Sequence, residues 1–194
     1  MAHTFEAKRT AVLGMDCQMA IVTNYVKDDQ RGFLERAARV LRRARGAGMT
    51  VIHVQVGFRA KMPEIGTRNP LFSALKNSPQ HRQMFEGGGG AIHPALAPEG
   101  DDIVVTKHRV SAFAGTDLEM ILRANEIDTL VLFGIATSGV VLSTLLEAGD
   151  ADYRIFVVRD CCFDIDREVH ECLVGKLFPK RAAVIDAGEF LEGK

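Results

Sequence analysis

Short β-branched apolar runs alternate along this chain with longer segments of helical periodicity. Six such runs are present, at Thr10–Met15, Thr50–Val56, Asp102–Thr106, Thr129–Phe133, Arg154–Val158 and Ala182–Ile185. Runs this apolar suit strands that are covered on both faces, so they predict a parallel sheet. Helical patterns or caps fall between them, at Gln30–Gly48, Thr116–Ala124, Ser138–Ala148 and Arg167–Phe178. The alternation therefore predicts an α/β fold of three layers, α/β/α, around a doubly wound, Rossmann-like sheet.

Length and charge narrow the class of protein further. A chain of 194 residues suits one domain, residues 1–194. Its 24 Lys and Arg residues nearly balance 25 Asp and Glu residues, so we expect neither nucleic acid nor an anionic membrane as a partner. The uncharged stretch between Asp128 and Glu147 contains Gly134, Gly139 and five hydroxyl residues, and it is more typical of a strand, turn and helix than of a membrane span.

The opening residues and the cysteines both indicate a cytoplasmic protein. The first ten residues, MAHTFEAKRT, lack the apolar region of a signal peptide. Cys17, Cys161, Cys162 and Cys172 have no metal-type or secretory spacing, which favours reduced thiols in a reducing compartment.

The segment Gly57–Gly100 interrupts the alternation. It is rich in Pro, Gly, Asn and Ser and includes four consecutive glycines, Gly87 to Gly90. Long irregular segments in compact domains usually serve as lids, binding loops or interface arms, and we expect one of these here. The glycines lack the Lys-Ser/Thr of a phosphate loop, which favours a hinge over a phosphate cradle.

Polar residues follow several of the predicted strands, where open α/β sheets bind ligands. Asp16 follows the first strand and Lys107 the third, and the fourth runs through Gly134–Gly139 into a helix start. A long Lys side chain can reach an Asp one or two strands away, and helix-start N–H groups can stabilise an oxyanion. The alternative is a structural ion pair beside a plain β-α turn, and the residues alone leave both open.

Four ordered segments resemble the isochorismatase-like (cysteine hydrolase) superfamily of nicotinamidases, N-carbamoylsarcosine amidases and isochorismatases. They read AVLGMDCQ, VVTKHRVSAF, LVLFGIATSGVVLSTLLEA and VVRDCCFDIDREVH, and the resemblance covers Thr10 to Phe190. It implies a hydrolase with a six-stranded parallel sheet, a site of Asp, Lys and Cys, and a cis peptide at Ile135–Ala136. It also implies a homodimer or homotetramer, and closed symmetry is the usual form of such assemblies.

The resemblance assigns the catalytic positions to Asp16 and Lys107, and it assigns the oxyanion and cis-peptide loop to Ile135, Ala136 and Gly139. Val140 stands where the family has its nucleophilic cysteine. Because valine has no lone pair, the thioester route of the amidases is closed at that position.

We expect no metal and no cofactor. The metal-binding nicotinamidases carry an Asp and paired His after the second strand, where this chain reads His53-Val54-Gln55-Val56-Gly57-Phe58. His53 is more typical of a satisfied core or interface histidine than of a ligand.

Three functional hypotheses remain. The first is a hydrolase without a covalent intermediate, in which Asp16 is a general acid whose pKa is raised by burial and Lys107 holds a substrate carboxylate or orients water. Its small-molecule substrate would carry a carboxylate, because the residues after strands two and three suggest an apolar pocket with a cationic rim: Phe58, Arg59, Arg109 and Phe113.

The second hypothesis supplies a substitute thiol, Cys161 or Cys162, from beyond the fifth strand. The third is a binding or interaction protein that kept the hydrolase fold and lost the chemistry.

Overall fold

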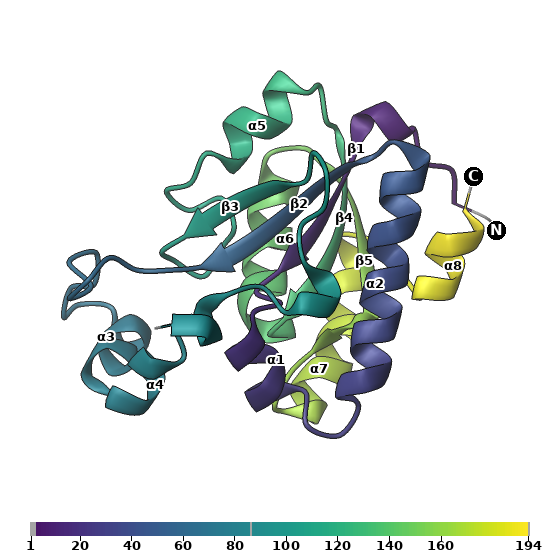
Figure 1. Ribbon diagram of the computed structural model, residues 1–194. Coiled ribbons are helices and arrows are strands. Elements are labelled where there is room, and N and C mark those ends of the chain that lie inside the picture. Colours follow the sequence, from purple (N-terminus) through teal and green to yellow (C-terminus); the bar gives the residue numbers. More distant parts are fainter. Residues whose placement is uncertain (1–2, 86, 194) are drawn as a thin grey trace.

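One parallel sheet organises the molecule (Figure 1). The computed structural model describes residues 3–85 and 87–193, and within them six strands pair in the order β3-β2-β1-β4-β5-β6. They are β1 (Thr10–Met15), β2 (Thr50–Val56), β3 (Ile103–Lys107), β4 (Thr129–Ile135), β5 (Arg154–Phe163) and β6 (Ala183–Ile185). The predicted doubly wound sheet is confirmed.

Helices cover both faces of this sheet, with α2 and α8 on one face and α5 and α6 on the other (Figure 1). The helices are α1 (Met19–Tyr25), α2 (Gln30–Ala47), α3 (Pro70–Asn77), α4 (Pro79–Gln83), α5 (Leu118–Ala124), α6 (Leu142–Asp150), α7 (Arg167–Cys172) and α8 (Ala187–Glu192). In the described part of the chain, no helix is both long and apolar enough to cross a membrane.

The central strands carry the core. Every residue of β1 and β4 is buried, whereas the edge strand β3 exposes Val104 and Thr106. Helix α2 buries an apolar stripe that includes Phe33 and Leu41. It ends at Gly48, whose φ of 74° is the left-handed conformation that glycine adopts at little cost.

Strand β5 extends five residues beyond the predicted end at Val158, so Asp160, Cys161 and Cys162 lie inside a strand and not after it. The pairing with β4 shifts here: Leu132 pairs with Val157, but Gly134 pairs with Cys162. The polar residues that suggested a strand end are satisfied within the fold. For example, the Asp160 carboxylate accepts a hydrogen bond from the Ala187 N–H at 2.8 Å.

Three predicted helices begin or end differently. The helix predicted over Thr116–Ala124 begins two residues later, as α5 at Leu118, and Glu119 pairs with Arg123 at 2.6 Å. The predicted helix Ser138–Ala148 opens as a wide turn over Thr137–Val141, and α6 follows. The predicted helix Arg167–Phe178 is shorter than expected: it forms α7 and continues as a second wide turn over Leu173–Leu177.

The irregular segment between β2 and β3 contains helices that the sequence pattern did not predict. Helices α3 and α4 lie beyond the arrowheads of β2 and β3 (Figure 1). Gln18 ties the returning chain to the sheet: its amide N–H₂ donates to the Val56 carbonyl at 2.9 Å and to the Gly90 carbonyl at 2.7 Å. The segment is therefore anchored across the carboxyl end of the sheet.

Candidate active site

An aspartate and a lysine meet at the carboxyl end of the sheet. Asp16 follows β1 with a φ of 54°, a left-handed conformation that aspartate tolerates better than most residues, and its N–H donates to the Val54 carbonyl at 2.8 Å. Lys107 is the last residue of β3, two strands away. Its Nζ lies 2.8 Å from Asp16 Oδ2.

Both members of this ion pair are buried, with 6% of Asp16 and 3% of Lys107 exposed. Burial raises the pKa of the Asp16 carboxyl above its ordinary value, and the positive charge of Lys107 opposes that shift without cancelling it. Lys107 Nζ also donates to the Arg109 carbonyl at 3.1 Å. Within the described residues, Asp16 Oδ1 is buried and has no hydrogen-bond partner.

The end of β4 pairs with the end of β1, next to Asp16, and leads into a loop. The Ile135–Ala136 peptide is cis, as the resemblance implies. Gly134 before it has a φ of 148°, and a Cβ there would collide with the Met15 carbonyl. Only glycine fits this close approach, which brings the end of β4 against Met15, the residue before Asp16.

Polar contacts from β5 and α7 hold the wide turn that follows. Thr137 Oγ1 and His170 Nδ1 share a hydrogen bond of 2.8 Å, and the Ser138 N–H donates to Asp164 Oδ2 at 2.7 Å. Sequence reasoning missed both His170 and Asp164, although both fall in the segment VVRDCCFDIDREVH that carried part of the resemblance. The Gly139 N–H, which we expected to face a ligand, donates to the Ala136 carbonyl at 3.1 Å because the turn closes on itself.

A cavity of about 700 Å³ opens onto these groups. Asp16, Lys107 and Val140 all line it, together with Ile135 and Ala136 of the cis loop. Val140 is 2% exposed, so its side chain is part of the cavity wall. The three positions at which the resemblance placed the family's catalytic groups therefore share one cavity.

The four residues expected to form the substrate pocket lie outside the lining of this cavity. Phe113 packs against Tyr153, with ring centroids 6.1 Å apart. Arg59 pairs with Glu64 at 2.6 Å, and Arg109 donates to the Glu64 carbonyl at 2.9 Å. Phe58 packs against the aromatic rings of Phe72 and Phe85. The cationic rim is absent because both arginines are engaged by Glu64.

Helices α3 and α4 and the residues after them supply the wall instead. The lining residues from this segment are mostly apolar, namely Leu71, Phe72, Leu75, Met84 and Phe85. Phe58 packs behind them, with its ring 6.0 Å from that of Phe72 and 5.8 Å from that of Phe85. Sequence reasoning singled out the segment but not these residues.

The cysteines near the site are buried and protonated. Burial raises the pKa of Cys17 far above its ordinary value, and it raises the pKa of Cys162 to about 12. Burial also raises the pKa of Cys161 well above its ordinary value. None of these thiols is among the residues that line the cavity. The hypothesis of a substitute thiol from Cys161 or Cys162 therefore loses its geometric basis.

His53 is a satisfied core histidine, as expected: its Nε2 lies 2.9 Å from Asp102 Oδ2 and 2% of the residue is exposed. Across residues 3–85 and 87–193, no three His, Cys, Asp or Glu side chains are grouped so that they could hold a metal ion.

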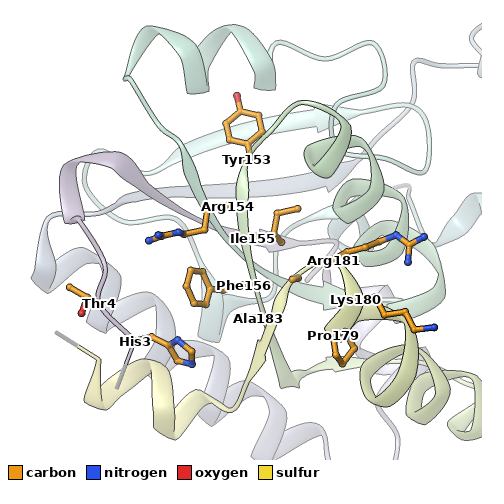
Figure 2. A pocket seen from close by; sticks show the side chains of 11 residues that line it. His3, Thr4, Tyr153, Arg154, Ile155, Phe156, Pro179, Lys180, Arg181 and Ala183 are labelled. Carbon is orange, nitrogen blue, oxygen red and sulfur yellow. The ribbon is translucent and has the colours of Figure 1, made fainter. Parts of the chain in front are cut away.

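A second cavity, of about 650 Å³, lies at the opposite end of the sheet beside the start of β5. Its cationic side chains do not converge. Figure 2 shows Arg154 pointing away from Lys180 and Arg181, which project from the other side of the cavity. No carboxylate is among the described residues that line it. The first cavity is the better candidate site, because there an acid and a base-type side chain meet.

Comparison with known proteins identifies the family of this chain. Residues 10–189 match the isochorismatase domain family. The chain is 34% identical over 174 residues to a ureidoacrylate amidohydrolase of Methylorubrum extorquens, covering 80% of this chain and 70% of that protein. It is 32% identical over 139 residues to a maleamate amidohydrolase of Pseudomonas putida, covering 71% of this chain and 63%, less than two thirds, of that protein.

A solved isochorismatase family protein from Burkholderia thailandensis has the same fold. It superimposes with a TM-score of 0.83 at 29% sequence identity, covering 99% of this chain and 100% of that chain.

Proposed function

Because this chain belongs to the isochorismatase family of hydrolases, we propose that it hydrolyses a small molecule through Asp16 and Lys107, without a covalent intermediate at residue 140. One observation carries the proposal: Asp16 Oδ1 has no hydrogen-bond partner among the described residues, although it is buried beside the cavity. Buried polar atoms are normally paired, so an orphaned oxygen at a cavity is a place for a substrate atom or a water.

Asp16 acts as the general acid. Burial raises the pKa of its carboxyl, which increases the fraction of Asp16 in the protonated form that a general acid requires, and the rest is the ion pair with Lys107. The carboxyl gives its proton to the leaving atom as the scissile bond breaks. A water oxygen bonds to the electrophilic carbon and returns a proton to Asp16, so the residue ends as it began.

Lys107 positions and stabilises the carboxylate formed between these two proton transfers. Its Nζ, held by Asp16 Oδ2 at 2.8 Å and the Arg109 carbonyl at 3.1 Å, keeps Asp16 in one orientation and leaves Oδ1 for the substrate. Ile135 and Ala136 of the cis loop form another part of the cavity lining. Val140 fills the place of a thiol with an apolar side chain, so water attacks the substrate directly.

An amide is the first bond to test. The relatives named above are a maleamate amidohydrolase and a ureidoacrylate amidohydrolase, and both names describe hydrolysis of an amide-type bond. Maleamate and ureidoacrylate therefore begin the substrate panel, followed by neutral amides, esters and vinyl ethers.

The panel is assayed with the wild type, Asp16→Asn and a control, Asp117→Asn, at the exposed start of α5 where the carboxylate caps nothing. We expect hydrolysis of at least one compound by the wild type and the control, and its loss in Asp16→Asn. If the folded wild type hydrolyses nothing, the hydrolase proposal fails and the binding-protein hypothesis takes its place.

The absence of a covalent intermediate is tested with iodoacetamide. Cys172 is the exposed thiol, so the assay uses Cys172→Ala to remove it. We expect this variant to keep its activity after alkylation. Inactivation would mean that one of the buried thiols acts as a nucleophile.

We also propose that the protein works in the cytoplasm as a homodimer or homotetramer, without a cofactor. Its unpaired cysteines suit a reducing compartment, and closed symmetric assemblies are the usual form of soluble oligomers.

A further inference from the structure

The cavity has an apolar half and a polar end. Leu71, Phe72 and Leu75 face it from α3, and Met84 and Phe85 face it from the residues after α4. Asp16 and Lys107 lie at the other end, where the strands finish. A ligand whose reacting bond reaches Asp16 therefore places the rest of its structure against hydrocarbon.

The charges of the cavity do not suit an anionic ligand. Among the described residues that line it, Lys107 is the sole Lys or Arg, and Asp16 and the Arg109 carbonyl engage two of the three N–H donors of its ammonium group. Asp164 adds a second carboxylate to the lining, and its oxygens accept from the N–H groups of Ser138 and Asp166. A substrate carboxylate would lose water and would have to share the Lys107 charge with Asp16. His81 is the other basic side chain among the described residues of the lining.

The arginines after β2 and β3, Arg59 and Arg109, are not among the residues that line the cavity. The Arg109 guanidinium lies 5.6 Å from the centre of the Phe72 ring, in a cation–π arrangement, and donates to the carbonyls of Glu64 and His108. Arg59 is held by the Glu64 carboxylate. The Arg109 charge therefore lies against the apolar wall from outside the cavity, and the Arg59 charge is paired with Glu64.

The apolar lining continues to the surface. Leu71 on α3 is 61% exposed, and Ile165 between β5 and α7 is 69% exposed, yet both line the cavity. Large aliphatic side chains this exposed gain from being covered by an apolar ligand.

We propose that this site selects an electrically neutral substrate with an apolar group about the size of an aromatic ring, which lies against the wall formed by α3, α4 and Phe85. This inference rests on the proposed hydrolase function for the reacting end of the ligand. The volume of about 700 Å³ lies within the range of ordinary small-molecule sites and leaves room for such a group.

Two probes of matched shape test the charge preference. Benzamide is neutral, whereas 4-carbamoylbenzoate is the same amide with a carboxylate at the far end of the ring. Binding is measured by calorimetry at pH 8, where imidazoles carry little positive charge. We expect benzamide to bind at least tenfold more tightly. Equal or tighter binding of 4-carbamoylbenzoate, or no measurable binding of benzamide, would overturn the inference.

Variants of the wall test where the ring lies. Phe72→Ala should weaken benzamide binding about tenfold, because it removes an aromatic contact. Leu71→Lys places a cation at the mouth, and it should raise the affinity for 4-carbamoylbenzoate relative to benzamide by about fivefold or more. Met120→Lys is the matched control, since Met120 is 68% exposed on α5, outside the cavity lining. Unchanged binding in Phe72→Ala and Leu71→Lys would contradict the assigned wall.

Asp16→Asn separates this inference from the proposed function. If benzamide binds the wild type and this variant alike but no panel compound is hydrolysed, the hydrolase proposal fails and the neutral, apolar preference stands. If a carboxylate compound such as maleamate is hydrolysed more efficiently than every neutral amide, the hydrolase proposal stands and the preference fails.

Discussion

Replacing Lys107 with methionine isolates the buried ion pair at the centre of the site. Methionine keeps most of the length and hydrocarbon of the lysine side chain and removes its charge. Asp16 then remains buried, with 6% of the residue exposed, and without its counter-ion.

The expected loss of stability follows from this geometry. Two unit charges 2.8 Å apart attract by about 6 kcal/mol at an effective dielectric constant of about 20. Removing one partner of a buried pair typically costs about 3–5 kcal/mol, because the other charge is left uncompensated. We therefore expect Lys107→Met to lower the free energy of unfolding by about 3–5 kcal/mol at pH 8.

The loss should depend on pH in a definite direction. Burial already raises the pKa of Asp16 above the unfolded value of about 3.9, and loss of Lys107 raises it further. An acid with a raised pKa in the folded state destabilises the protein progressively as pH rises from the unfolded pKa to the folded one. The free energy of unfolding that Lys107→Met loses at pH 8 should therefore be partly regained at pH 5. The gain is about 1.4 kcal/mol for each pH unit over which Asp16 is protonated in the folded variant but ionised in the unfolded chain.

Urea unfolding at pH 5 and pH 8 measures both effects. The control is the double variant Asp16→Asn with Lys107→Met, which removes both charges and should recover to within about 1 kcal/mol of the wild type. A pH-independent loss of less than about 1 kcal/mol in Lys107→Met would refute the reasoning, because it would mean that the pair is solvated.

Further predictions concern the loop, the nucleophile position and the assembly. Gly134→Ala should abolish activity and lower the melting temperature, because a Cβ would collide with the Met15 carbonyl; a fully active, equally stable variant would contradict this. Val140→Cys should gain amide hydrolysis that iodoacetamide abolishes, with Asp16 accepting the thiol proton; an inactive but folded variant would count against the site. Light scattering at micromolar concentration should give the mass of a dimer or tetramer, not a monomer. Elemental analysis should find no stoichiometric transition metal.

The sheet and the ion pair were predictable from the sequence because both follow from local patterns. Continuous apolar runs identified the strands, and the rule that ligands meet the carboxyl ends of parallel strands selected Asp16 and Lys107. The resemblance added the cis peptide at Ile135–Ala136, which no composition or periodicity would have indicated.

The substrate pocket was less predictable because nearness to a strand end does not fix the direction of a side chain. Phe58 and Arg109 follow β2 and β3 as expected, but they lie behind Phe72. Phe72 itself belongs to α3, an eight-residue helix too short to give a clear period within a polar segment.

The extended β5 was missed for a different reason. Arg159 and Asp160 look like the polar end of a strand, yet the chain stays paired through the register shift opposite Gly134. Arg159 is satisfied by Asp186 after β6, a tertiary contact that local sequence does not reveal.

The most direct test of the account is the steady-state activity of Asp16→Asn on the best substrate of the wild type. Benzamide binding and circular dichroism establish that the variant is folded. We predict a fall in kcat of about 10²–10⁴, the usual contribution of a general acid, with little change in KM. A kcat within about threefold of the wild type would contradict the assignment of Asp16 as the proton donor.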